Sequence, residues 1–206
     1  MKIFGVLFSP FVRKAYLVAA EKGVTVEAGT GGPGNPTDEF VAASPFRKIP
    51  AMIDGDYSLC DSTAIAAYLD AKYPEPALYP ADPRLRGKAV WFEEYADTII
   101  PVAALPILRN RFVLPKFMGI PGDEAQAVAG EEALAPMLDW LEQEVPAEGW
   151  LVGEAFSIAD IAVATAIKTL SYVSSPIEPS SRPKTAAWYD RVCARPAWQQ
   201  VAAIEG

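Results

Sequence analysis

The stretch Leu7-Phe8-Ser9-Pro10-Phe11-Val12-Arg13-Lys14 marks the point where an expected strand gives way to an expected helix. The apolar run from Ile3 to Phe8 indicates a strand, and proline is favoured at a first helical position because its φ is already helical and its missing N–H would have no partner there. Ser9 therefore lies beside unpaired backbone N–H groups and the positive end of the helix dipole. Such a serine either caps the helix or helps to hold an anion, for example a thiolate.

The residue types in the chain limit the chemistry that Ser9 can perform. The sequence has no histidine, which excludes a Ser-His-Asp hydrolase, and no serine lies within a G-x-S-x-G sequence. Ser9 is therefore expected to act as a hydrogen-bond donor rather than as a base-activated nucleophile. Cys60 and Cys193 are far apart and form no C-x-x-C pair, so no metal site is expected.

Composition and charge are typical of a soluble globular protein. Of the 206 residues, 51% are apolar and 21% are charged, and the net charge of −8 weighs against general binding of nucleic acid. The sequence has no run of about 20 apolar residues that would cross a bilayer, and the N-terminal apolar run is too short for a signal peptide. We therefore expect no membrane partner and a cytoplasmic protein. Four of the seven basic residues within 1–80 form two pairs that favour an anionic ligand there: Arg13-Lys14 and Arg47-Lys48.

The first third of the chain alternates between strand and helix signals. Short apolar runs predict strands, amphipathic runs predict helices, and Asp54-Gly55 is a strong hairpin signal. The expected elements are strand 2–7, helix 11–22 ended by Gly23, strand 25–28, a weak helix 37–43, strands 50–53 and 57–59, and helix 62–72. The order βαβ-α-ββα has a hairpin where a parallel sheet would need a crossover, so it indicates a small mixed sheet.

The remainder of the chain carries only helix signals. Residues 74–86 contain four prolines and little periodicity, which is typical of a linker. Helices are expected at 86–113, 123–144, 158–173, 184–194 and 197–203. Pro101 and Pro106 are expected to kink or break the first of these helices, because each removes a backbone hydrogen bond. The predicted fold class is α/β plus all-α, with a βα domain over 1–78 and an all-helical domain over 87–206.

A second motif, Arg47-Lys48-Ile49-Pro50, leads into a predicted strand. The residue before a proline is pushed towards an extended conformation. If the Ile49–Pro50 bond is cis, this backbone is able to pair with an extended peptide as a sheet edge does. An ordinary edge-strand proline is the alternative.

A third motif, Cys60-Asp61-Ser62, lies where a strand ends and a helix begins. The first N–H groups of that helix can bind a carboxylate, and Asp61 can bind an ammonium group. A site that accepts both groups on one carbon is a receptor for the α-carbon of an amino acid. The alternative is a helix N-cap assisted by the acidic side chain, with Cys60 as a packed thiol.

The three motifs occur in the order found in cytosolic glutathione S-transferases. Because they lie within a βαβ-α-ββα unit that a helical domain follows, the chain resembles the serine-type, bacterial-like members of that family: Ser9-Pro10-Phe11, Lys48-Ile49-Pro50 and Asp61-Ser62. The resemblance covers essentially the whole chain and implies a thioredoxin-like N-terminal domain, an all-helical C-terminal domain and a homodimer. Ser157-Ile158-Ala159-Asp160 resembles the capping box of the family's helical core, where its role is in folding.

The resemblance assigns roles to individual residues. It implies that glutathione is the co-substrate and that Ser9 stabilises its thiolate. The implied glutathione-binding residues are Lys48 for the glycyl carboxylate, Ile49 and Pro50 for the cysteinyl backbone, and Asp61 and Ser62 for the γ-glutamyl group. Relatives often hold the glycyl end with Lys, His or Gln near 29–36, where this chain offers only Thr30 and Asn35.

The second substrate is expected to be a small hydrophobic electrophile in an apolar cleft between the domains. Its candidate walls are apolar and aromatic residues: Phe11, Tyr95, Ile99, Leu105, Phe112 and Phe117. Such a stripe at helical spacing is also typical of a core. Arg109 and Arg111 would suit an anionic substrate, but a solvated helix face is the commoner explanation for such arginines.

The predicted activity is conjugation of glutathione to such an electrophile. Serine at position 9 cannot form a mixed disulfide, so the site favours conjugation, isomerisation or peroxide reduction over disulfide exchange. A glutathione-dependent isomerase, dehalogenase or peroxidase on the same site is one alternative. A glutathione-transferase-like binding module without turnover is the other.

Overall fold

The computed structural model describes residues 1–174 and 176–205, and it divides the chain into two compact units. Unit 1 comprises Met1–Ala89 together with Val192–Gly206, and unit 2 comprises Val90–Arg191. Residues 192–205 thus group with the N-terminal unit, whereas the sequence places them in the helical domain. The domain limits 1–78 and 87–206 themselves stay a prediction.

Unit 1 is built on a four-stranded mixed sheet, as the element order predicts. The strands are β1 (Lys2–Phe4), β2 (Glu27–Gly29), β3 (Ala51–Asp54) and β4 (Tyr57–Cys60), in the spatial order β2-β1-β3-β4. β1 is parallel to β2 and antiparallel to β3, and β3 is antiparallel to β4. The βα unit followed by a hairpin confirms the predicted thioredoxin-like topology.

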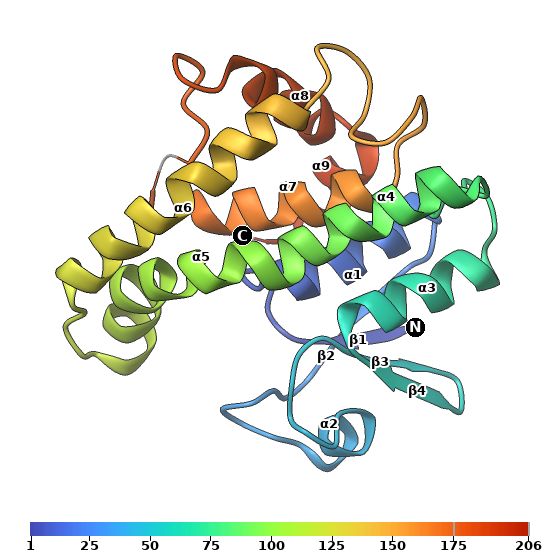
Figure 1. Ribbon diagram of the computed structural model, residues 1–206. Coiled ribbons are helices and arrows are strands. Elements are labelled where there is room, and N and C mark those ends of the chain that lie inside the picture. The colour runs from blue at the N-terminus through green and yellow to red at the C-terminus, as the bar shows by residue number, and fades with distance from the viewer. Residues whose placement is uncertain (175, 206) are drawn as a thin grey trace. The chain divides into compact units, whose positions relative to one another are not determined.

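Helices cover both faces of this sheet (Figure 1). α1 (Pro10–Glu21) and α3 (Ser62–Lys72) lie on one face, and α2 (Asp38–Ala43) lies on the other. Phe4 of the central strand is fully buried and packs against Phe40 of α2, with 5.8 Å between the ring centroids. α1 has a buried middle because it contacts the strand layer, α3 and α9 (Pro196–Ala203).

The first strand is shorter than the sequence predicts. The sequence predicts a strand over 2–7, but β1 ends at Phe4 because Gly5 has a φ of 128°, a value that side chains rarely allow. Residues 5–8 form a loop instead, and Ser9 follows as the residue that precedes α1. The strand thus ends early enough to leave a short loop between β1 and the N-terminus of α1.

The described elements of unit 2 are all helical, as predicted. They are the end of α4 (Pro83–Glu94), the π-helical segment η1 (Tyr95–Ile99), α5 (Ile100–Leu108), the π-helical segment η2 (Arg109–Met118), α6 (Glu124–Glu144), α7 (Ile158–Leu170) and most of α8 (Pro183–Cys193). α7 is buried along nearly its whole length. Gly130 brings α6 close to α5, since a Cβ at that position would lie 2.8 Å from the carbonyl oxygen of Ala103.

The helix from Pro83 to Met118 runs without a break through Pro101 and Pro106, so the sequence prediction is wrong in so far as it allowed for a break there. A proline ring crowds the carbonyl four residues earlier. The π-helical turns of η1 end just before Pro101 and widen the helix where that ring must fit. By length and composition alone, this 36-residue helix would be able to cross a membrane, but core helices of soluble proteins meet the same test.

Candidate active site

Three loops of unit 1 meet at the carboxyl end of β1. The first contact is between Gly5 and Ile49: a Cβ built on Gly5 would lie 3.1 Å from Cβ of Ile49 and 2.5 Å from Cγ2 of Val12. Only a glycine allows the loop before α1 to approach the loop before β3 so closely. The Ser9 motif and the Ile49-Pro50 motif, which the sequence identifies separately, are therefore neighbours.

The Ile49–Pro50 peptide bond is cis, one of the two conformations that the sequence left open. Pro50 is buried, and its carbonyl accepts the backbone N–H of Asp61 at 3.3 Å. This hydrogen bond joins the second motif to the third. Ile49 stays half-buried beside Gly5.

Asp61 and Ser62 occupy the start of α3. Asp61 has a φ of 83°, a strained value for a residue with a side chain, and its carboxylate oxygen Oδ1 accepts the N–H groups of Thr63 and Ala64 at 2.9 and 3.1 Å. The capping role is therefore present, yet Asp61 is exposed, while Ser62 is buried as the first residue of the helix. Backbone strain of this kind is typical of functional sites.

Ser9 precedes α1 in an extended conformation, with φ −69° and ψ 126°. Its backbone N–H donates to the carbonyl of Val6 at 3.0 Å, and its carbonyl accepts the N–H of Arg13 at 3.0 Å. Its hydroxyl makes no capping hydrogen bond to α1 within the described chain. Ser9 therefore does not act as a side-chain cap of α1. It is half-buried, and its hydroxyl lies at the helix N-terminus without a hydrogen bond to the first turn in the described part of the chain.

Ser44 supports this site, although it belongs to none of the three sequence motifs. This buried serine follows α2, and its hydroxyl both accepts the backbone N–H of Lys48 at 2.9 Å and donates to the Lys48 carbonyl at 2.7 Å. The two bonds fix the turn that leads into Ile49, in which Arg47 has a φ of 54°. The side chain of Lys48 is exposed, so it is accessible to a ligand. A serine directly before a proline was the only signal in the sequence.

The pair Arg13-Lys14 is buried and cannot serve as the ligand-binding pair that the sequence suggests. Arg13 is 2% exposed and Lys14 is fully buried. Nζ of Lys14 donates to Oγ1 of Thr63 at 3.1 Å, so this lysine holds α1 against the start of α3. The charge available to an anionic ligand here comes from the exposed Arg47 and Lys48.

The loop at 29–36 holds the two residues that the sequence offers for the glycyl end. Thr30 and Asn35 are exposed, and Asn35 forms an isolated bridge with Gly32. The carbonyl of Thr30 accepts the hydroxyl of Thr37 at 3.0 Å, which leaves the loop anchored at its end. Both residues stay candidates for the glycyl anchor.

Among the pocket candidates, Tyr95 belongs to the core of unit 2. It is 2% exposed, its hydroxyl donates to the carbonyl of Met137 at 2.8 Å, and its ring lies 4.9 Å from that of Trp140. Burial raises its pKa. The aromatic stripe has two possible roles, as core or as pocket wall, and Tyr95 belongs to the core.

The other candidates are partly or fully accessible. Phe11 and Ile99 are half-buried, and Leu105 and Phe117 are exposed. Phe112 is half-buried, with its ring 5.6 Å from that of Phe117. Their role as pocket walls stays a prediction.

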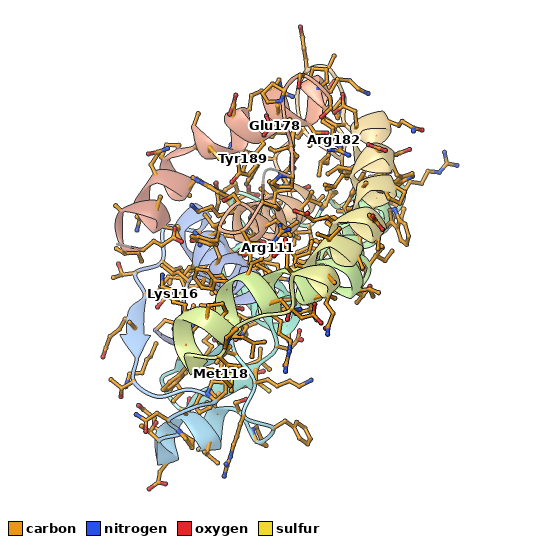
Figure 2. All side chains as sticks on the ribbon, turned by 90° about the vertical axis from the view of Figure 1, so that its left-hand side faces the viewer. Arg111, Lys116, Met118, Glu178, Arg182 and Tyr189 are labelled. Atoms are coloured by element: carbon orange, nitrogen blue, oxygen red, sulfur yellow. The ribbon has the colours of Figure 1, made fainter. Side chains whose placement is uncertain are left out.

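The guanidinium of Arg111, which Figure 2 labels, is engaged by acidic side chains of α6. Its guanidinium forms ion pairs with Glu124 and Glu131 of α6, each at 2.5 Å, and these carboxylates raise its pKa. Arg111 therefore fastens η2 to α6, while Arg109 is exposed. The sulfur atoms of Cys60 and Cys193 form no disulfide, and both residues are half-buried.

Replacing Gly5 by alanine should disturb the packing of the loop before α1 against the loop before β3. The new methyl group would overlap Val12 and press on Ile49, at a φ of 128° that alanine does not tolerate. We expect the free energy of unfolding to fall by about 3 kcal/mol and the affinity for glutathione to weaken. Gly55→Ala is the control, because Gly55 also has a positive φ, of 66°, but has nothing within 4 Å of its Cβ position. Equal losses in urea unfolding for both variants would contradict the close approach.

Comparison with known proteins agrees with this geometry. A model of the glutathione S-transferase N-terminal domain matches residues 3–77, and a model of the C-terminal domain matches residues 95–196. The chain is 34% identical to Glutathione S-transferase 3 of Zea mays, covering 99% of this chain and 94% of the relative. It is 31% identical to Glutathione S-transferase F10 of Arabidopsis thaliana, covering 98% and 96%.

A solved structure extends the likeness to three dimensions. The theta class glutathione S-transferase of Xanthomonas axonopodis pv. citri, crystallised with glutathione bound, aligns with a TM-score of 0.81. That protein is 28% identical, and the alignment covers 97% of this chain and 95% of that one. The chain therefore belongs to the glutathione S-transferase family and is an enzyme of that family, with glutathione as its co-substrate.

Proposed function

We propose that this enzyme conjugates the thiolate of glutathione to small hydrophobic electrophiles, and that the Ser9 hydroxyl donates a hydrogen bond to the sulfur. The observation that carries the proposal is the Ser9 hydroxyl itself, which lies at the N-terminus of α1 and does not cap that helix within the described residues. A donor in this position, together with the helix dipole, stabilises a negative charge. The proposal extends the family's activity to a specific residue and substrate class.

Stabilising the thiolate of glutathione requires only a modest free energy. A thiol of ordinary pKa, about 8.5, is only a few per cent ionised at pH 7. Lowering that pKa by about 2 units corresponds to roughly 2.7 kcal/mol of preference for the thiolate. A hydrogen bond to a charged acceptor supplies about 1.5–3 kcal/mol, and a helix N-terminus adds about 0.3–1 kcal/mol.

The other motifs supply the rest of a tripeptide site. In the proposal, the backbone of Ile49 beside the cis Pro50 pairs with the cysteinyl part of glutathione, as a sheet edge pairs with an extended strand. Asp61 and Ser62 bind the γ-glutamyl group at the start of α3. The exposed side chain of Lys48 binds the glycyl carboxylate.

The proposal also includes the assembly and location that are typical of the family. We propose a homodimer, and the side chain of Phe46, which is 85% exposed on the loop before Lys48, is available for a contact between subunits. We propose a cytoplasmic location.

Two measurements on the unmodified protein test the proposed activity. Titration calorimetry measures glutathione binding, and absorbance measures conjugation to 1-chloro-2,4-dinitrobenzene. We expect both binding and turnover. Binding without turnover across a panel of aryl halides, epoxides and peroxides would favour a binding module, and turnover of peroxides alone would favour a peroxidase. The absence of glutathione binding would contradict the proposal as a whole.

A further inference from the structure

Arg13 connects the loop that carries Ser9 to a distant part of the sequence. This arginine lies in the first turn of α1, and Nη2 of its buried guanidinium donates to the carbonyl of Leu7 at 2.7 Å. Leu7 is only two residues from Ser9 in the loop that follows Gly5. The position of the guanidinium therefore bears directly on the path of the chain into Ser9.

Glu205 holds that guanidinium in place. One carboxylate oxygen lies 2.9 Å from Nη1 and the other lies 2.6 Å from Nη2, so the pair is bidentate. The Glu205 side chain is itself only 17% exposed. Buried charged groups need such partners, and a two-pronged contact fixes the plane of the guanidinium as well as its position. Nη2 serves both the carboxylate and the Leu7 carbonyl, so the two contacts depend on each other.

We propose that Glu205 is a positioning residue for the thiolate site and acts through Arg13 on the Leu7–Ser9 segment. Glu205 follows α9, and α9 packs against α1 in unit 1. Its carboxylate orients the arginine, the arginine fixes the Leu7 carbonyl, and the Leu7 carbonyl sets the position of the Ser9 hydroxyl. The inference rests on the proposed function of Ser9.

A second ion pair in the same unit provides a matched control. Arg195, which directly precedes α9, binds Glu21 through Nε and Nη2, both at 2.7 Å. This pair therefore also joins the α9 region to α1. Glu21 is the last residue of α1, at the opposite end of the helix from Ser9. Both pairs are bidentate and partly buried, but Arg13 also donates to the carbonyl of Leu7 in the loop before Ser9, whereas the Glu21 pair lies at the far end of α1.

The experiment compares Glu205→Gln with Glu21→Gln in the full chain. We expect Glu205→Gln to lower kcat/KM for conjugation about tenfold, mainly through kcat, because the Ser9 hydroxyl no longer meets the sulfur in the best geometry. With glutathione saturating and the electrophile varied, the acidic limb of the kcat/KM–pH profile should shift to higher pH, since the bound thiol loses part of its stabilisation. Glu21→Gln should stay within about twofold of the wild type in both readouts. Arg13→Lys keeps the charge but loses the two-pronged contact, and it should reproduce the shift in the pH profile.

The possible results distinguish a failure of the positioning role of Glu205 from a failure of the proposed role of Ser9. An unchanged pH profile in both Glu205→Gln and Arg13→Lys would overturn the inference while leaving the role of Ser9 intact. Equal shifts in Glu205→Gln and Glu21→Gln would also overturn it, because they would show a general loosening of α1. A wild-type protein that binds no glutathione would overturn the proposed function and this inference together.

Discussion

Alanine in place of Ser9 is expected to lower kcat/KM for conjugation by between about tenfold and about a hundredfold at neutral pH. The substitution removes the hydroxyl that would donate to the thiolate, and it leaves the N-terminus of α1 as the remaining source of stabilisation. Because the hydroxyl does not cap the helix within the described residues, the fold should lose little stability. A large loss of activity with a small loss of stability is the signature of a residue used for chemistry.

Two control variants make the Ser9 result specific. Ser9→Thr keeps a hydroxyl and should retain more activity than Ser9→Ala. Ser58→Ala removes an exposed hydroxyl from β4 in the same unit and should have no effect on kcat/KM. The measurement is the initial rate with 1-chloro-2,4-dinitrobenzene at saturating glutathione, together with the melting temperature of each variant. Wild-type rates in Ser9→Ala would move the thiolate chemistry to another group.

Alanine in place of Asp160 is expected to cause the largest loss of stability. The carboxylate is fully buried and accepts three N–H groups: the backbone N–H of Leu151 at 2.9 Å, that of Ser157 at 3.0 Å, and Nε1 of Trp188 at 2.8 Å. Removing it leaves all three donors buried without this acceptor, each at a cost of about 1–3 kcal/mol. We therefore expect the free energy of unfolding of unit 2 to fall by about 4 kcal/mol, well above the roughly 1 kcal/mol of an ordinary cap.

Asp123→Ala is the matched control for Asp160. Asp123 also precedes a helix of unit 2, and its carboxylate accepts the N–H groups of Ala125 and Gln126 at 2.9 and 3.3 Å. It is exposed, so its loss should cost only about 1 kcal/mol. Urea unfolding followed by tryptophan fluorescence measures both variants. Similar losses for the two would show that Asp160 is no more than a cap.

The pH dependence of stability gives a second readout for Asp160. Burial raises the pKa of this carboxyl, so the folded protein keeps a proton on it at pH values where the unfolded chain has lost one. Its contribution to stability is therefore largest below the ordinary pKa of about 3.9 and falls as the pH rises towards the raised value. The stability advantage of the wild type over Asp160→Asn should shrink between about pH 4 and neutral pH.

The elements of the fold could be predicted from the sequence because their signals are local. Gly23, with a φ of 66°, ends α1 as expected, and the hairpin that Asp54-Gly55 predicts is present, with Gly55 and Asp56 as the turn between β3 and β4. α3 spans Ser62–Lys72 as predicted. The unbroken helix through Pro101 could not be predicted, because the π-helical turns that accommodate the proline leave no distinct pattern in the sequence.

The supporting contacts of the site depend on long-range packing, and the sequence does not show them. Arg13 and Glu205 are 192 residues apart, and Lys14 and Thr63 are 49 apart. Basic side chains in a sequence suggest a charged surface, but folding buries Arg13 and Lys14 beneath the site. The motifs therefore predict which residues face the ligand, while the residues that hold them in place emerge only from the structure.

A crystal structure of the protein with glutathione would show whether Ser9 holds the sulfur. We expect the sulfur to lie within hydrogen-bond distance of Oγ of Ser9, with the cysteinyl part paired to the backbone of Ile49. A Ser9 hydroxyl bonded to its own main chain, with glutathione absent from the loops around Gly5 or bound elsewhere, would contradict it.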